Sequence, residues 1–255
     1  MMNSDVELEG KSLETKGSSE RSVRVDLAAA YHLAEIFDMT ELIWNHISAR
    51  VPGKEEHFLI NPIGFMYDEV TASNLVKIDI DGKKIAGDGR TSEAGFVIHS
   101  AVHRARPDVV CVMHSHTIEG VAVSCMEEGL LQLCGETAFL YDDVGYHDYE
   151  GISLELDERE RIVQALGNKH ALILRNHGLL TVGESVAEAF MRMFWLQYSC
   201  KVQLKLLSMG REFITLPETL AAKTAEQNQE VAAPGTFEWP ALLRRLDRVS
   251  PNYKY

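Results

Sequence analysis

The chain has 255 residues, 45% of them hydrophobic, which is enough to bury a substantial core in one large domain. Its 25 lysine and arginine residues are outnumbered by 38 aspartate and glutamate residues, and the formal net charge of −13 argues against a surface that binds nucleic-acid phosphates or anionic membranes. No apolar run approaches the roughly 18 to 20 residues of a membrane span, and the first residues are polar rather than signal-like. We therefore expect a cytoplasmic protein.

Motifs for nucleotide cofactors and paired thiols are missing from the sequence. No Gly-x-Gly-x-x-Gly or Gly-x-x-x-x-Gly-Lys run follows a predicted strand, which disfavours a Rossmann fold and a nucleoside triphosphate loop. The cysteines form no Cys-x-x-Cys pair and are expected to be buried free thiols: Cys111, Cys125, Cys134 and Cys200.

Hydrophobic periodicity predicts alternating helices and strands along the chain. Apolar positions at three- and four-residue intervals indicate an amphipathic helix over residues 23–38, and a later helix over 94–105 begins after Thr91-Ser-Glu93. The other predicted elements are strands over 42–50, 57–60, 76–80, 109–113, 171–175 and 179–182, and helices over 117–126, 157–167 and 184–209.

Because strands and helices alternate irregularly and hairpins occur, we expect one α/β domain with a mixed or mainly antiparallel sheet flanked by helices. We assign residues 23–216 to this domain. Residues 1–22 are polar and aperiodic, which predicts a flexible N-terminal arm. Residues 217–255 are assigned to a polar C-terminal extension with a short helix over 239–246.

Three histidines at the ends of buried strands are the candidate metal ligands. His114 and His116 are one residue apart, so in a strand with a side-chain period of two they project to the same side. His177 follows the strand predicted over residues 171–175. Three imidazoles with an open fourth position are the pattern of a catalytic zinc site. From spacing alone, a hydrogen-bonded core histidine and a turn histidine stay as the alternative.

Several segments together resemble the class II aldolase and adducin head-domain family. The resemblance covers residues 25–209, and Tyr146-His-Asp-Tyr-Glu-Gly151 is similar to the adducin branch. The segments that carry it are Asn45-His-Ile-Ser-Ala-Arg50, His57-Phe-Leu-Ile-Asn-Pro-Ile-Gly64, Thr91-Ser-Glu93-Ala-Gly-Phe-Val-Ile-His-Ser100, Arg106-Pro-Asp-Val109, His114-Ser-His116-Thr and Arg175-Asn-His177-Gly-Leu179.

The resemblance implies a three-layer α/β/α fold and a homotetramer with active sites at subunit interfaces. It also implies a divalent metal, zinc first and manganese, iron or cobalt as alternatives, on His114, His116 and His177, with Glu93 as the acid/base. Without the family, Glu93 is simply a carboxylate stabilised by a helix N-terminus. The adducin head lacks this set of four residues, so its presence here argues for retained chemistry.

The positions that hold phosphate in sugar-phosphate aldolases of the family differ in part. Thr91, Ser92 and Gly64 still offer hydrogen-bond donors, whereas His46 and Ile63 change the pocket. For His99 and His103 a surface or helix-packing role is favoured over metal binding.

The expected activity is a metal-dependent lyase that cleaves a carbon–carbon bond of a small hydroxy-carbonyl compound through a metal-stabilised enolate. A decarboxylase acting on a carboxylate substrate shares that intermediate and stays open. A non-enzymatic adducin-like interaction module and oxygen chemistry at iron are further alternatives.

Overall fold

The computed structural model describes residues 19–53, 56–151 and 158–255, without the side chains of residues 93, 94 and 96. Most of the predicted N-terminal arm lies outside these residues. The described strands form one eight-stranded sheet in the order β4-β3-β2-β1-β5-β8-β7-β6, in which only β6 and β7 pair in parallel. Its strands are β1 (His46–Arg50), β2 (His57–Ile60), β3 (Val76–Asp79), β4 (Lys84–Ala86), β5 (Cys111–Ser115), β6 (Val144–His147), β7 (Ala171–Leu174) and β8 (Gly178–Gly183).

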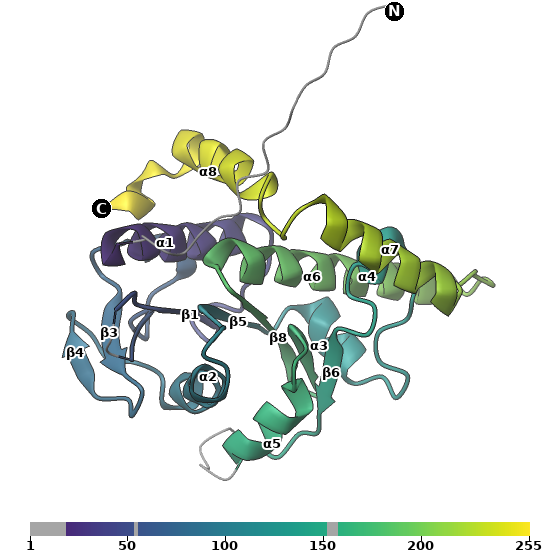
Figure 1. The fold of residues 1–255 in the computed structure, drawn as a ribbon, viewed down its shortest axis with the longest axis horizontal. Helices are drawn as coiled ribbons and strands as arrows, with labels where there is room; N and C mark the ends of the chain where they lie inside the picture. The colour runs from purple at the N-terminus through teal and green to yellow at the C-terminus, as the bar shows by residue number, and fades with distance from the viewer. Residues whose placement is uncertain (1–18, 54–55, 152–157) are drawn as a thin grey trace, which may run out of the picture.

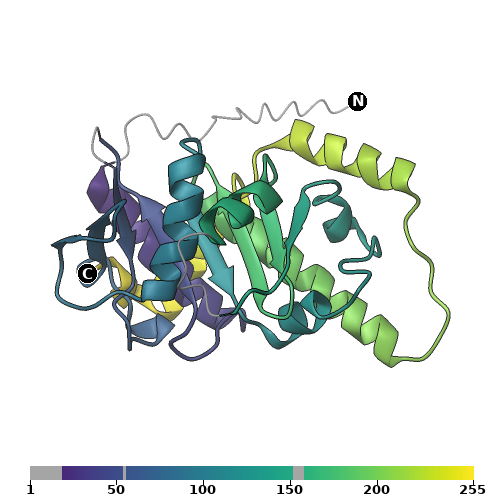
Figure 2. The same ribbon diagram turned by 90° about the horizontal axis from the view of Figure 1, so that it is seen from below.

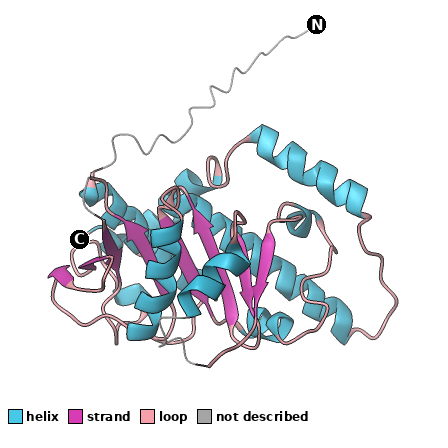
Figure 3. Ribbon diagram, turned by 60° about the horizontal axis from the view of Figure 1, so that its bottom comes forward, coloured by secondary structure: helices cyan, strands magenta, loops and turns pink. Residues whose placement is uncertain are grey.

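Helices cover both faces of the sheet (Figure 1), and the strands lie between the two helical layers (Figure 3). One face carries α1 and α6, with α8 packed on the outer side of α1, and the other face carries α2 and α5, which come forward in Figure 2. The helices are α1 (Glu20–Ile36), α2 (Glu93–Ala105), α3 (Ile118–Ser124), α4 (Gly135–Ala138), α5 (Glu158–Leu166), α6 (Val186–Ser208), α7 (Glu218–Val231) and α8 (Glu238–Val249), with 3-10 turns η1 (Tyr67–Glu69) and η2 (Pro251–Lys254). The predicted three-layer α/β/α fold with a mainly antiparallel sheet is confirmed.

Alternation along β5 separates two hydrophobic clusters. Cys111 and Met113 belong to the large cluster under α1 and α6, while Val112 belongs to the cluster under α2 and α5. This alternation follows from the two-residue period of a strand. His114 therefore shares the face of Val112, on the side covered by α2. The central strand thus places its histidine between the sheet and a helix.

The observed elements lie close to the predicted ones, with differences at their ends. The strand predicted over residues 109–113 runs two residues later, so His114 is inside β5 rather than after it. Helix α1 begins at Glu20, with the Ser19 side chain accepting a hydrogen bond from the Ser22 amide, so residues 20–22 are helical rather than part of an arm. Helix α7 and strands β4 and β6 were not predicted, because their short or polar sequences carry little periodicity.

The C-terminal segment packs onto the body of the domain. Trp239, Leu246 and Tyr253 are buried in the large cluster that contains α1. The backbone carbonyl of Tyr253 accepts a hydrogen bond from the Ala72 amide at 2.9 Å. Residues 238–255 therefore complete the core beside α1 instead of trailing from it. None of the helices in the described part of the chain is long and apolar enough to cross a membrane.

Candidate metal centre

His114, His116 and His177 meet at one end of strands β5 and β8. One ring nitrogen from each lies within 4.8 Å of the other two. β5 supplies His114, and His116 follows it directly. His177 sits in the turn between β7 and β8, where Asn176 adopts a positive φ of 55° and the His177 amide donates to the Leu174 carbonyl at 3.1 Å. Antiparallel pairing of β5 with β8 brings this turn to the end of β5.

The hydrogen bonds made by Nδ1 of His114 and of His116 turn the Nε2 atoms of the two rings toward each other. His114 Nδ1 lies 2.9 Å from the Leu179 carbonyl oxygen, and His116 Nδ1 lies 2.7 Å from Glu41 Oε2. A carbonyl and a carboxylate accept hydrogen bonds, so each Nδ1 carries a proton. The two Nε2 atoms are 2.7 Å apart. At that distance either one Nε2 carries a proton and donates to the other, or both are bare and a bound cation offsets the repulsion of their lone pairs.

Burial keeps two of the imidazoles neutral at pH 7. The pKa of His114 is held well below its usual range by burial and then by the neighbouring His116 and His46. Burial, followed by repulsion from His116, lowers the pKa of His177 to about 4. Neutral imidazole is the form that binds a metal. The Nδ1 contacts to a carbonyl and a carboxylate are the orienting interactions that metal-binding histidines usually make, so the residues present fit a divalent ion.

A cavity of about 440 Å³ opens beside the three rings. Trp44 and Tyr149 flank it and are 58% and 53% exposed, and the Tyr149 ring centre lies 6.1 Å from that of His177. Its described lining residues are Glu41, Trp44, His46, Ser92, Ile98, His114, His116, Tyr149, Gly151, Asn176 and His177. These residues include neither lysine nor arginine. A small polar molecule with an apolar edge fits such a cavity.

The predicted substrate-binding residues fall into two groups. His46 and Ser92 line the cavity, and the Ser92 hydroxyl also accepts a hydrogen bond from the Gly95 amide at 3.2 Å as the N-cap of α2. Gly64 and Thr91 are not among the described residues that line it. Glu93 begins α2 directly after Ser92, but its side chain lies outside the described part of the structure.

Sequence reasoning missed Glu41 and Ser48, and it gave His99 and His103 only a surface or helix-packing role. Glu41 comes from the loop before β1 and has no motif to mark it. His99 and His103 are 3% and 1% exposed, which excludes the surface role considered for them. Ser48 lies between them. The sequence did contain a signal for Ser48, His99 and His103. His46 and Ser48 have the two-residue spacing of one face of a strand, and His99 and His103 have the four-residue spacing of one face of a helix.

These features define an α/β protein with three histidines that could hold a metal ion, gathered at the ends of central strands of a mainly antiparallel sheet. The sequence profile of the Class II Aldolase and Adducin N-terminal domain matches residues 25–204. The chain is 46% identical to alpha-adducin of Mus musculus in an alignment that covers 98% of this chain and 36% of the adducin.

Two solved structures share the whole fold. An aldolase II superfamily protein from Pseudomonas syringae is 46% identical, with a TM-score of 0.87 over 96% of this chain and 100% of that one. L-fuculose 1-phosphate aldolase from Glaciozyma antarctica is 28% identical, with a TM-score of 0.83 over 96% of both chains. The chain belongs to the class II aldolase and adducin family.

Proposed function

We propose that the protein is a metal-dependent lyase that cleaves a carbon–carbon bond in a small hydroxy-carbonyl compound, with zinc on His114, His116 and His177. The observation that carries this proposal is the cluster of three imidazoles whose ring nitrogens lie within 4.8 Å of one another beside a cavity, because that arrangement suits a bound cation. A divalent ion there would supply a Lewis acid that polarises a carbonyl group. Relatedness to a fuculose-phosphate aldolase supports the reaction class.

Glu93 is proposed as the acid/base that moves the proton at the carbon next to the carbonyl. Its backbone begins α2 directly after Ser92, which lines the cavity, so the residue is close to the space that the substrate would fill. Helix N-termini favour a carboxylate. An acid/base must gain and lose a proton near neutral pH. A carboxylate can do this where burial raises its pKa.

The lining of the cavity supports an uncharged substrate group over a phosphate. None of its described residues is a lysine or an arginine, and His46 is neutral because burial, followed by repulsion from His99, holds its pKa well below the usual range. Anionic phosphates are normally held by cationic side chains or several backbone amides. Ser92 is the hydroxyl donor proposed to bind the substrate. Thr91 and Gly64 are proposed as weaker or indirect contributors, because they lie outside the described lining.

We also propose a cytoplasmic homotetramer whose interfaces adjoin the metal centre. Leu42, Trp44 and Ile118 are 65%, 58% and 84% exposed, and all three lie close in sequence to residues of the centre. Exposed apolar side chains of this size are typical of contact surfaces between subunits.

Exchange of carbon-bound hydrogen tests the function without knowledge of the aldehyde partner. Zinc-loaded protein is incubated in deuterium oxide with dihydroxyacetone, its phosphate or pyruvate, and loss of the proton signal beside the carbonyl is followed by NMR. We expect exchange with dihydroxyacetone, and we expect Glu93→Gln to keep its zinc and lose at least about a hundredfold in rate. Full exchange by Glu93→Gln would refute the acid/base role.

Two other outcomes separate the alternatives. Release of carbon dioxide from a keto acid, with no exchange of the hydroxy ketones, would favour the decarboxylase. Protein that takes up no zinc, manganese, iron or cobalt and exchanges nothing would favour a non-enzymatic interaction module, the second candidate, which the 46% identity to alpha-adducin supports. Oxygen uptake by the iron-loaded form would point to oxygen chemistry.

A further inference from the structure

A chain of three hydrogen bonds runs from the cavity into the interior beneath α2. His46 Nδ1 lies 2.8 Å from His99 Nε2, and His99 Nδ1 lies 2.6 Å from Ser48 Oγ. Ser48 Oγ lies 2.8 Å from Nε2 of His103, whose ring stacks on Phe58 with centres 4.4 Å apart. Strand β1 supplies alternate residues 46 and 48, and α2 supplies residues 99 and 103 one turn apart. All four polar residues are less than 7% exposed.

The donors and acceptors along this chain of hydrogen bonds are ordered, because each neutral imidazole has one N–H and one lone pair. Burial, followed by repulsion from His103, holds the pKa of His99 well below its usual range, and burial lowers that of His103 to about 3. Every hydrogen bond needs one proton between its two atoms. The Ser48 hydroxyl can donate only one hydrogen bond but can accept two. A proton on Nδ1 of His103 therefore makes all three bonds point away from the cavity, with His46 donating from Nδ1, whereas a proton on Nε2 of His103 is compatible with either tautomer of His46.

His103, at the inner end of the hydrogen-bond chain, favours one direction of donation. His103 Nδ1 is buried and has no hydrogen-bond partner among the described residues, and the Val109 backbone carbonyl partly opposes the lowering of the His103 pKa. A carbonyl can only accept, so its proximity favours the proton on Nδ1 of His103. Ser48 then donates to His103, His99 donates to Ser48, and His46 donates to His99. His46 Nε2 is left with a lone pair for the cavity that the ring lines.

The position of the His46 ring is also tightly constrained. A side chain at Gly95 would come within 2.9 Å of His46 Cδ2, so only glycine lets α2 approach the ring this closely. On its other side the His46 ring centre lies 5.0 Å from that of His114. With Nδ1 held by His99, the ring has little freedom to turn.

We propose that His46 orients the substrate by accepting a hydrogen bond from one of its hydroxyl groups, and that His99, Ser48 and His103 are positioning residues that fix its ring and its tautomer. The proposal rests on the proposed lyase function. It narrows the substrate to compounds that present a donating hydroxyl beside the reacting carbonyl. A fully ionised phosphate, which only accepts, is repelled at this point.

The tautomer is measured directly on the zinc-loaded protein labelled with ¹⁵N-histidine. Long-range proton–nitrogen correlation spectra distinguish ring nitrogens that carry a proton from bare ones, and His46 is assigned by the signals that disappear in His46→Gln. We expect a proton on Nδ1 and a bare Nε2. A proton on Nε2 of His46 would overturn the assigned direction. This measurement needs no substrate, so it stands even if the proposed lyase activity fails.

Removing the hydroxyl in the middle of the chain tests the positioning role. Ser48→Ala is expected to mix the two His46 tautomers and to raise KM for dihydroxyacetone exchange by about fivefold with kcat nearly unchanged, because a hydrogen bond made equally in the ground and transition states is lost. Ser48→Thr keeps a hydroxyl and is expected to restore both values.

Ser100→Ala is the matched control, since this buried serine on α2 donates to the Val97 carbonyl of its own helix at 3.3 Å and does not belong to the hydrogen-bond chain. It is expected to leave the tautomer and KM unchanged. If Ser48→Ala behaves like Ser100→Ala in both measurements, the positioning role is wrong. A lost tautomer preference in protein that shows no exchange at all would support the chain and refute the lyase instead.

Discussion

The two ends of strands β5, β7 and β8 use histidine and charge in opposite ways. At one end, His114, His116 and His177 gather at a cavity with no cationic side chain among its described residues, and two of their Nδ1 atoms are held by Leu179 and Glu41. The rings are ordered before any ligand arrives. At this end the fold gathers ring nitrogens that could bind a metal ion beside the cavity.

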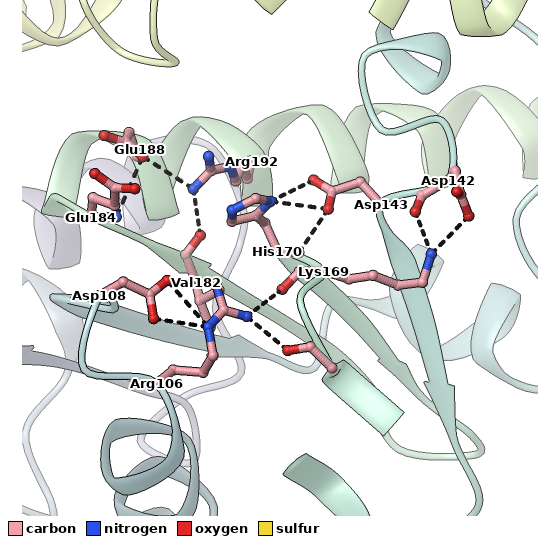
Figure 4. Close-up of polar contacts among 11 residues, drawn as sticks. Arg106, Asp108, Asp142, Asp143, Lys169, His170, Val182, Glu184, Glu188 and Arg192 are labelled. Atoms are coloured by element: carbon pink, nitrogen blue, oxygen red, sulfur yellow. Dashed lines mark hydrogen bonds and ion pairs between the residues drawn. The ribbon is translucent and has the colours of Figure 1, made fainter. Parts of the chain in front are cut away.

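At the other end of the same strands, ion pairs surround the loops (Figure 4). Arg106 pairs with Asp108 at 2.7 Å and also donates to the Gly167 carbonyl at 2.8 Å, and His170 Nδ1 lies 3.0 Å from Asp143. The hydrogen bond from Arg106 lowers the pKa of Asp108, which is 46% exposed. Here Arg106 and His170 each have a carboxylate partner, and the side chains of Asp108 and His170 are partly exposed to solvent.

The two ends differ in how far water reaches their polar side chains. This difference explains why one end is suited to binding a metal ion and the other to holding loops in place. Exclusion of water makes the charged form of histidine costly, so buried rings stay neutral and keep lone pairs for a metal. Partly exposed ion pairs are satisfied by each other and by water, and they contribute little to the free energy of unfolding. We therefore expect substitutions at the two ends to differ in kind as well as in size.

The largest expected effect is loss of the metal from His116→Ala. With one of three ligands gone, zinc content after dialysis should fall from about one ion per chain to less than about a tenth, because a site of two imidazoles binds zinc weakly. Elemental analysis of purified protein gives the number. His170→Ala is the matched control at the opposite end and should keep its zinc. Equal zinc in both variants would remove His116 from the ligand set.

The second expected effect is a pH dependence that comes from a buried histidine. The unfolded chain holds histidine at a pKa near 6.5, whereas His103 in the folded protein has a pKa of about 3. Between these values the unfolded state binds more protons, so the contribution of His103 to the free energy of unfolding is complete above about pH 6.5 and is lost as the pH falls toward 3.

Replacing His103 with phenylalanine should make acid destabilisation less steep, by at most about 1.4 kcal/mol per pH unit, since one titrating group is removed. Urea unfolding near pH 7 and near pH 5 measures this slope. The other buried histidines keep part of the dependence. A slope identical to that of the unaltered protein would show that His103 does not contribute.

The smallest expected effect is that of Asp108→Ala at the charged end. Arg106 keeps its hydrogen bond to the Gly167 carbonyl in this variant, and exposed pairs are worth less than about 1 kcal/mol. The midpoint of urea unfolding should shift only slightly, and zinc content should not change. A loss of about 3 kcal/mol or more would mean that the ion pairs hold the strands together as strongly as buried contacts do.

Much of this fold could be predicted from local pattern. Strand β2 occupies the predicted residues 57–60, and α2 and α5 lie within one residue of their predicted ranges. Elements without hydrophobic periodicity were not predicted. Helix α7 is an example, because its buried positions are alanines. The polar C-terminal segment was set apart from the domain in the prediction, yet its few large apolar residues, such as Trp239 and Tyr253, are buried in the core.

The sequence by itself determined which residues can bind a metal and which of them lie close along the chain. The two-residue spacing of His114 and His116 places both on one side of a strand, and His177 follows a buried strand, because side-chain direction is set locally by strand geometry. Only the tertiary structure decided which atoms face the cavity. Pairing of His46 with His114 across β1 and β5, and the approach of Glu41 to His116, join residues far apart in the chain. Such contacts depend on the packing of whole elements, which no local pattern records.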